Sequence, residues 1–450
     1  PPPPETVIDL EALEEFEAFE ELVGRVRVAD EYVSAVLSEV GLVSLRDGVL
    51  RVAAPQRSFA HIELTGRPEG VKPWDDLNDT ERAVFARLME AYAGFAEHTD
   101  AQIGRLVDTL KDLGKYDNTL FIYIAGDNGA SAEGGLDGTF NELMALNGIP
   151  QDLGDVLPRL DEVGGPTAFN HYPVGWAHAM NTPFQYTKQV ASHYGGTRNA
   201  VAVSWPTGIE ARGEVRDQWH HVIDIVPTIL EAAGLPEPYL VNGAAQKPIE
   251  GVSMAYTFDD PNADGRHRTQ YFEIFGNRGI YQDGWTAVTH HSTPWLNRDW
   301  PSLDADDWEL YDTNTDWSQA HDLSKEMPDK LRAMQYLFMI EAAKYGVFPL
   351  DDRRYERFNA ATAGRPDLPA GRTTMTFYPG MDTLMENTVL NVKNRSFSVT
   401  AQVGVPEGTL GELERLLGGG AADGVIVAQG GRFAGWSLYI KNGRAKYVHN

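Results

Sequence analysis

The chain has 450 residues and a formal net charge of −27, with 38 basic and 65 acidic side chains. Its fractions of apolar residues (42%) and charged residues (23%) are typical of a globular protein with a sizeable core and two or three domains. Arg and Lys are scattered and form no basic stripe, so we expect neither nucleic acid nor a membrane as a partner. The absence of Cys excludes disulfides, thiolate metal sites and a Cys nucleophile.

The sequence indicates neither a membrane span nor a signal peptide. No apolar stretch reaches the length of a span, and the start, Pro1-Pro2-Pro3-Pro4, lacks a basic n-region and an apolar h-region. The first residue is not Met and residues 446–450 stop inside a strand-like pattern, so both ends look cut. We expect a soluble protein whose oligomeric state the sequence does not indicate.

Residues 1–61 are acidic and helical in pattern, and they carry no recognisable chemistry. Their Glu-rich stretch, residues 11–22, has apolar side chains at helical spacing and predicts a solvated helix with one packing face: Leu13, Phe16, Phe19 and Leu22. Residues 62–76 are punctuated by Pro and Gly and read as a loop. This loop opens a predicted α/β core that spans residues 62–265.

A long amphipathic helix, residues 78–113, leads through Gly114 into the apolar run Thr119–Ala125, which predicts a buried strand of an α/β sheet. Asp127-Asn128-Gly129 follows directly. Ligands gather at the carboxyl ends of strands in such sheets, and an Asp-Asn pair offers the oxygen ligands that Ca²⁺ and Mg²⁺ prefer. The alternative is a plain turn, because Asn-Gly is a strong turn dipeptide.

Residues 129–196 are rich in Gly and Pro and form a long connection, which inside a compact domain is usually functional or disordered. Aromatic and His side chains argue against disorder: Phe169, His171, Tyr172, Trp176, His178, Phe184 and Tyr186. They would suit an aryl group stacking in a pocket, but core packing explains them equally well.

The second half of the chain predicts a strand and a helix of the core, then a small antiparallel subdomain with a helix over residues 266–371. The strands and helices expected, in chain order, are Asn199–Trp205 (strand), Asp224–Ala233 (helix, with Pro227 in its first turn and Gly234 after its end), Gln270–Phe275, Gly279–Tyr281, Trp285–Thr289 and Trp308–Tyr311 (strands), and Met327–Tyr345 (helix). Gln282-Asp283-Gly284 is expected to form a hairpin turn.

Residues 372–450 change character and predict a separate β-rich module, a β-sandwich cut off at its end. Thr and Val alternate with polar residues over Thr388–Val403, and Asn442-Gly443 is expected to form a hairpin turn within Ser437–Val448.

Three further groups of polar residues are candidates for binding or catalysis by residue type alone. Lys188, close to Gly195-Gly196, could bind an oxyanion, because a compact cation would face the anion and a Gly-Gly turn lets backbone approach it; a surface Lys is the alternative. The His pairs 220–221 and 290–291 are expected to be core or surface residues, since adjacent side chains point in different directions. Three loop carboxylates with no matched partner are expected to be solvated: Glu133, Glu142 and Asp155. No nucleophile elbow, P-loop, Rossmann fingerprint, HExxH motif or EF-hand is present.

Four segments in order resemble the sulfatase family over residues 62–345, with bacterial arylsulfatases as the nearest likeness. They are Tyr116–Ser131, which contains the metal-binding signature; Phe184–Lys188 with Gly195-Gly196-Thr197-Arg198; His221–Gly234; and Trp308–Asp312 with Asp316 and Asp322-Leu323. Residues 346–450 resemble the C-terminal extension of one bacterial subgroup. This bacterial likeness favours a cytoplasmic location.

The resemblance implies an alkaline-phosphatase-like α/β fold and hydrolysis of sulfuric esters. It implies that Asp127 and Asn128 bind a divalent cation, Ca²⁺ or alternatively Mg²⁺. It also implies that Lys188 contacts the sulfate oxygens of a small-molecule sulfate ester. The family attacks the ester with a formylglycine hydrate made from Cys or Ser in a C/S-x-P-x-R motif.

The sequence departs from the family upstream of the matching region. The nucleophile motif and its Arg, the paired N-terminal metal Asp residues and the upstream Lys and His are absent, and part of the parallel sheet would be missing. Ser292-Thr293-Pro294 has Leu296 where the Arg is required, and His61 is too close to Asp127 to replace the upstream His. We therefore expect this chain alone to have no sulfatase turnover. A non-catalytic remnant that binds an anion or a partner, and a phosphate or phosphonate ester hydrolase of the same superfamily, are the alternatives.

Overall fold

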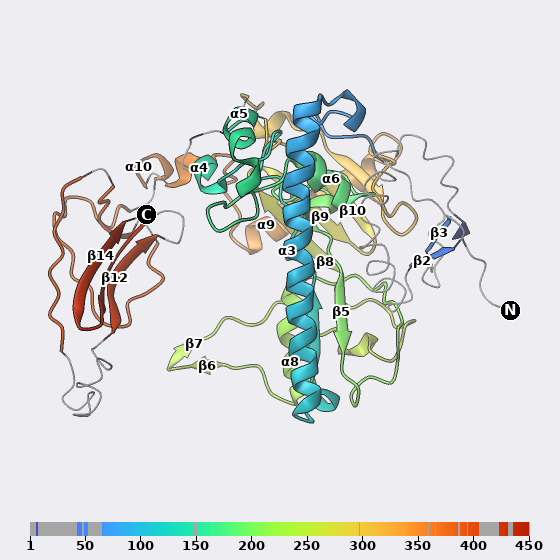
Figure 1. The fold of residues 1–450 in the computed structure, drawn as a ribbon. Helices are drawn as coiled ribbons and strands as arrows, with labels where there is room; N and C mark the ends of the chain where they lie inside the picture. Colours follow the sequence, from blue (N-terminus) through green and yellow to red (C-terminus); the bar gives the residue numbers. More distant parts are fainter. Residues whose placement is uncertain are drawn as a thin grey trace. The chain divides into compact units, whose positions relative to one another are not determined.

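The computed structural model describes residues 6–7, 43–46, 49–52, 65–146, 149, 151–296, 298–358, 360–364, 366–385, 388–393, 395–404, 423–430 and 435–449. The chain divides into two compact units, the first formed by residues 1–142 and 151–352 and the second by residues 143–150 and 353–450. Helices and small sheets alternate along the first unit, and strands prevail at the end of the second (Figure 1). The predicted mixture of helix and sheet, with an antiparallel subdomain, is confirmed.

The N-terminal region contains a three-stranded antiparallel sheet of β1 (Thr6–Val7), β2 (Val43–Arg46) and β3 (Val49–Val52). The helical pattern predicted for residues 1–61 is therefore wrong for residues 43–46 and 49–52. In the sequence, two Val- and Leu-containing runs flank an Asp-Gly dipeptide, a hairpin signal that the acidic composition concealed. The helix expected over residues 11–22 lies outside the described residues.

Helix α3 (Asp79–Asp112) begins and ends close to the predicted positions. Asn78 caps it by accepting hydrogen bonds from the backbone N–H groups of Thr80 and Glu81, and the Glu81 side chain completes a capping box. The N-terminal half of the helix supplies three side chains to the first core: Val84, Phe85 and Leu88. Apolar residues of the C-terminal half, such as Phe95 and Leu106, are exposed.

Strands β4 (Phe121–Ile124) and β5 (Val201–Ser204) confirm two predicted strands, and they form a two-stranded sheet. Their pairing is antiparallel, with Ile124 opposite Val201, whereas the sulfatase-like sheet was expected to be parallel. The end of β4 consequently lies beside the beginning of β5. Helix α8 (Ile225–Ala233) follows the 3₁₀ turn Val222–Asp224 and ends at Gly234, whose φ of 66° gives the left-handed C-cap.

The long connection between these strands folds into short helices rather than an unstructured loop. They are α4 (Glu142–Leu146), α5 (Leu153–Val156), α6 (Val174–Asn181), α7 (Tyr194–Thr197) and a 3₁₀ segment, Leu157–Glu162. Tyr172 is buried in the first core, and the Trp176 ring packs on Trp74 while its Nε1 donates to the Phe85 carbonyl. Core packing, rather than an aryl pocket, therefore accounts for these two aromatic residues.

The predicted antiparallel subdomain is a four-stranded sheet in the order β11-β10-β9-β8. Its strands are β8 (Thr269–Ile274), β9 (Asn277–Gln282), β10 (Trp285–Thr289) and β11 (Glu309–Asp312). Asp283 and Gly284 join β9 to β10, with φ angles of 47° and 87°. Such positive φ values are what a two-residue hairpin turn requires.

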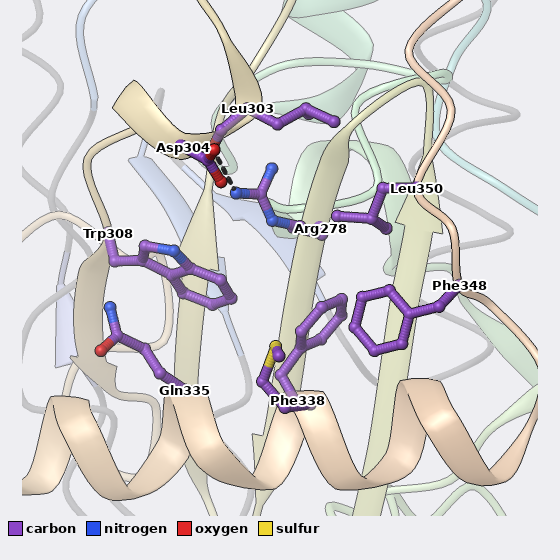
Figure 2. Close-up of a pocket in the computed structure, with 9 residues that line it drawn as sticks. Arg278, Leu303, Asp304, Trp308, Gln335, Phe338, Phe348 and Leu350 are labelled. Atoms are coloured by element: carbon purple, nitrogen blue, oxygen red, sulfur yellow. Dashed lines mark hydrogen bonds between the residues drawn. The ribbon is translucent and has the colours of Figure 1, made fainter.

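Helix α9 (Pro328–Lys344) packs on this sheet and closes the second core (Figure 2). The helix contributes Met334, Phe338 and Ala342, and the strands contribute Ile280, Ala287 and Leu310. A cavity of about 260 Å³ lies between α9, Trp308 and Leu350. Arg278 lines it, but its guanidinium is already bound to Asp306 at 2.7 Å and to the carbonyls of Gly276 and Leu303.

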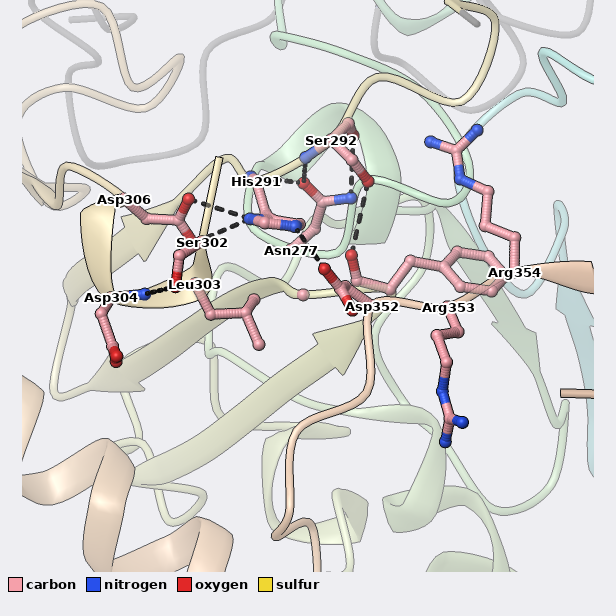
Figure 3. A network of polar contacts seen from close by, with 12 residues as sticks. Asn277, His291, Ser292, Ser302, Leu303, Asp304, Asp306, Asp352, Arg353 and Arg354 are labelled. Atoms are coloured by element: carbon pink, nitrogen blue, oxygen red, sulfur yellow. Dashed lines mark hydrogen bonds and ion pairs between the residues drawn. The ribbon is translucent and has the colours of Figure 1, made fainter. Parts of the chain in front are cut away.

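A polar network fixes the segment that follows β10 (Figure 3). Asn277 accepts hydrogen bonds from the N–H groups of His291 and Ser292, and His291 Nδ1 lies 2.9 Å from Asp306. His290 stacks on Tyr186, and burial lowers the pKa of His290 to about 4. The pair His290-His291 is therefore structural, as the sequence predicted.

The second unit contains an antiparallel sheet of β12 (Gly424–Gly430), β13 (Gly435–Lys441) and β14 (Arg444–His449), and the predicted Asn442-Gly443 turn joins the last two. The strand predicted over Thr388–Val403 is wrong: the described residues 388–393 and 395–404 form no strand. Local bonds compete with strand pairing there, because Thr388 N–H donates to Met385 and Asn391 accepts from Lys393 N–H.

The remaining short elements are β6 (Leu240–Val241), β7 (Ala244–Ala245) and α10 (Ala360–Ala363), with 3₁₀ turns at Trp74–Asp76, Tyr116–Asn118, Ala255–Thr257, Leu303–Ala305 and Tyr355–Phe358. Within the described ranges, no helix combines the length and the apolar character that a membrane crossing needs.

Candidate active site

The Asp127-Asn128 pair occupies the turn directly after β4, as the sequence predicted. Asp127 is exposed and Asn128 is half-buried, and the Asn128 amide donates to Asp127 Oδ1 at 2.7 Å. Asn199, at the beginning of β5, donates its Nδ2 to the carbonyls of Ala125 (3.2 Å) and Asn128 (2.6 Å). The antiparallel neighbour therefore holds the turn in place.

Gly129 allows the metal-signature segment to lie against the Gly-Gly segment, backbone to backbone. Gly129 N–H donates to the Gly196 carbonyl at 3.0 Å, and a Cβ at Gly129 would stand 1.6 Å from the Gly195 oxygen. A Cβ at Gly195 would stand 2.1 Å from the Gln185 oxygen. The predicted freedom of backbone approach is real, but in the structure it serves contact with other segments of this chain.

Lys188 joins the same arrangement through its main chain. Its N–H donates to the Ala130 carbonyl at 3.1 Å, two residues beyond Asn128. Asn181 locks the contact, because its Oδ1 accepts from Ala130 N–H (2.9 Å) while its Nδ2 donates to the Tyr186 carbonyl (3.1 Å). The structure thus brings together the two segments that carry the predicted site residues.

The Lys188 side chain is bound to Glu133. Its Nζ lies 2.8 Å from Glu133 Oε2, Ser131 Oγ donates to the same oxygen at 3.0 Å, and Gln189 Nε2 donates to Oε1 at 3.0 Å. Burial of Glu133 would raise its pKa, but these hydrogen bonds and the Lys188 charge outweigh it and hold the pKa below the ordinary value. The expectation that Glu133 is a solvated carboxylate without a partner is wrong, because Lys188 and Gln189 of a distant segment bind it.

Residues of β9 and of the loop after β11 also support the Lys188 segment. Gln319 accepts from Tyr194 N–H (2.8 Å) through its side chain and from Gln185 Nε2 (2.6 Å) through its carbonyl. Asn277 of β9 donates to the Gln189 carbonyl at 3.2 Å. Sequence reasoning missed Gln319 and Asn277, and no local pattern marks either of them.

His193 is a further residue to which the sequence analysis assigned no role. It is fully buried, its Nδ1 lies 2.9 Å from Ser192 Oγ, and its Nε2 lies 3.0 Å from Glu309 Oε2. Tyr311 donates to the same Glu309 oxygen at 2.6 Å. Burial of Glu309 would raise its pKa, but the His193 and Tyr311 contacts lower it overall. The position of His193 at the start of the Gly-Gly motif was the signal that could have identified it.

Asp224 anchors the start of the helix that follows. Its buried carboxylate lies 2.8 Å from Nδ1 of both His220 and His267, and it accepts from the N–H groups of His221 and Val252. Burial would raise the Asp224 pKa, but these bonds outweigh it and keep the pKa well below the ordinary value. The prediction that the His220-His221 pair is structural is confirmed.

The donors on this chain suit a hard cation in type. Asp127 offers a carboxylate and Asn128 an amide oxygen, the ligand types of Ca²⁺ and Mg²⁺ sites. Ca²⁺ takes about six to eight oxygen ligands, so two side chains supply only part of a coordination shell. Over the residues that the structure describes, no group of three or more His, Asp or Glu side chains could hold a metal ion.

Comparison with known proteins supports the resemblance to sulfatases. Residues 52–235 match the sulfatase family model. An uncharacterized sulfatase of Schizosaccharomyces pombe is 29% identical over 292 residues, covering 63% of this chain and 48% of that protein. An arylsulfatase of Klebsiella aerogenes is 29% identical over 195 residues, covering 43% of this chain and 39% of the relative. The chain spans about half the length, or less, of these curated relatives.

Solved structures show weaker likenesses. A crystal structure of Ps i-CgsB is 19% identical with a TM-score of 0.39, covering 67% of this chain and 52% of that chain. The putative sulfatase yidJ from Bacteroides fragilis is 14% identical with a TM-score of 0.33, covering 61% and 46%. The family match and the two curated relatives show that residues 52–235 are similar to the sulfatase family.

Proposed function

We propose that the chain carries part of the active site of a divalent-metal-dependent sulfuric ester hydrolase of the arylsulfatase type. One observation carries the proposal: the hydrogen bonds of Gly129 to Gly196 and of Lys188 to Ala130 bring the Asp127-Asn128 turn and the Lys188 segment together. The match of residues 52–235 to the sulfatase family supports it independently.

In this proposal Asp127 and Asn128 bind the cation, Ca²⁺ in preference to Mg²⁺, as two of its oxygen ligands. When bound, such a cation polarises the sulfuryl group of the ester. Lys188 contacts the sulfate oxygens, where a compact ammonium offsets charge that develops on them. Asn199 and Asn181 hold these residues in position through the contacts described above.

We further propose that this chain alone does not turn over sulfate esters. It has no Cys, and no Ser stands in a C/S-x-P-x-R motif, so it lacks the residue from which the family makes its nucleophile. Its two metal donors are also too few for a complete Ca²⁺ shell. Binding, not turnover, is therefore the property to measure.

Calorimetric titration of the purified chain with Ca²⁺ and with inorganic sulfate tests the proposal. The wild-type chain is expected to bind Ca²⁺, Asp127→Ala to lose that binding, and Lys188→Ala to keep Ca²⁺ but lose sulfate. Asp155→Ala is a matched control, because Asp155 is a carboxylate of the same connection whose side chain serves the capping box of α5. Equal Ca²⁺ binding by the wild type and Asp127→Ala would refute the assignment.

A further inference from the structure

The salt bridge between Lys188 and Glu133 has a consequence for anion binding, and this consequence rests on the function proposed above. Lys188 is the cation proposed to meet the sulfate group, yet its Nζ lies 2.8 Å from a carboxylate oxygen of its own chain. A carboxylate and a sulfate oxygen compete for the same ammonium protons, since both are anionic acceptors. Sulfate must therefore share or displace the Glu133 contact.

Glu133 is held in this position by more than Lys188. Ser131 Oγ and Gln189 Nε2 each donate to it, so both of its oxygens are engaged. Gln189 adopts a φ of 74°, a left-handed conformation that is uncommon for residues other than Gly, and its carbonyl is fixed by Asn277. The surrounding structure therefore fixes the Glu133 carboxylate beside Lys188.

The pair is also accessible to a ligand. About a third of the Lys188 side chain (33%) and a quarter of the Glu133 side chain (23%) are exposed. Desolvation is therefore incomplete, and exchange of one anionic partner for another is energetically feasible, because a partly exposed ion pair is only weakly stabilising.

We propose that Glu133 is a positioning residue that occupies Lys188 in the absence of substrate and competes with the sulfate group for it, lowering the affinity of the site for sulfate. The same contact holds the lysine ammonium at one place instead of leaving it free in solvent. Glu133 thereby favours release of inorganic sulfate from the site.

Calorimetric titration with sodium sulfate in the presence of Ca²⁺ tests this proposal on the wild-type chain and Glu133→Gln. The variant keeps the shape of the side chain but removes its charge, so we expect sulfate to bind about threefold to tenfold more tightly. Glu341→Gln is the matched control: it removes one negative charge beside a lysine of α9, Lys344, and should leave sulfate affinity unchanged. A merely structural role for Glu133 would give weaker binding, never tighter.

A second variant and a second measurement test the proposal even if Glu133→Gln does not fold. Glu133→Asp keeps the charge but withdraws the carboxylate by one methylene, so sulfate affinity should lie between those of the wild type and Glu133→Gln. Acetylation of Lys188, measured by mass spectrometry without any anion, should be faster in either variant than in the wild type.

The outcomes separate this inference from the proposed function. Tighter sulfate binding by Glu133→Gln supports the inference. Equal or weaker binding by Glu133→Gln overturns it while leaving the proposed function in place. Absence of sulfate binding in both the wild type and Glu133→Gln overturns the inference together with the proposed function.

Discussion

The sequence predicted a small antiparallel sheet for β8–β11 and a buried strand for β4, but in the structure only the sheet is closed. Strands β9 and β10 are buried almost throughout and α9 covers their apolar side chains. Strands β4 and β5 are half-buried or exposed at every position. An apolar run identifies a strand, but whether something covers it depends on the rest of the fold.

The candidate site joins these two regions. The Asp127-Asn128 turn comes from the open pair, whereas Lys188 lies in a segment held by Asn277 and Gln319 of the closed region. Placing reactive residues on a connection that a rigid sheet supports is common in enzymes. The free energy of unfolding should therefore come mainly from the closed region.

The largest effect is expected from Phe338→Ala in the closed region. Phe338 is 1% exposed and packs between α9 and the sheet, so its removal should leave a cavity and cost about 3–5 kcal/mol of unfolding free energy. Urea unfolding measures this loss. A cost below about 1 kcal/mol would show that this core is not well packed.

Asp224→Asn should cost about 2–3 kcal/mol, because the buried amide cannot satisfy two His side chains and two N–H groups equally well. The Asp224 pKa is lower in the folded chain than its ordinary value of 3.8. Its contribution is therefore complete above pH 3.8 and is lost as the pH falls further. Unfolding midpoints measured toward pH 2.5 should fall more steeply for the wild type; parallel curves would contradict this.

Gly129→Ala should cost about 1–3 kcal/mol, because the new methyl group would overlap the Gly195 carbonyl and push the two site segments apart. Ca²⁺ affinity should weaken in the same variant. Gly104→Ala in α3 is the matched control, since nothing lies within 4 Å of its Cβ position. Similar behaviour of the two variants would mean that the segments do not pack as described.

The smallest effect is expected from Phe95→Ala in the exposed C-terminal half of α3, the same substitution as at Phe338. Phe95 is 69% exposed, so the unfolding free energy should change by less than about 0.5 kcal/mol. A loss comparable to that of Phe338→Ala would erase the difference between the two regions, because it would show that Phe95 is buried in solution.

Local signals predicted much of the fold. The bounds of α3, the Gly234 C-cap and the Asp283-Gly284 turn stand where the sequence placed them, since each depends on a few neighbouring residues. The antiparallel direction of β4 and β5 and the bond of Glu133 to Lys188 could not be predicted. Both depend on residues far apart in the sequence, and no periodicity records such contacts.

The central claim is that Asp127, Asn128 and Lys188 form one site for a cation and a sulfate group. Sulfate affinity measured with and without Ca²⁺ tests it most directly, because two ligands that share a site must be coupled. We predict that Ca²⁺ raises the sulfate affinity of the wild-type chain about tenfold or more and has no such effect in Asp127→Asn. Sulfate affinity that is the same in the wild type with and without Ca²⁺ would contradict the account.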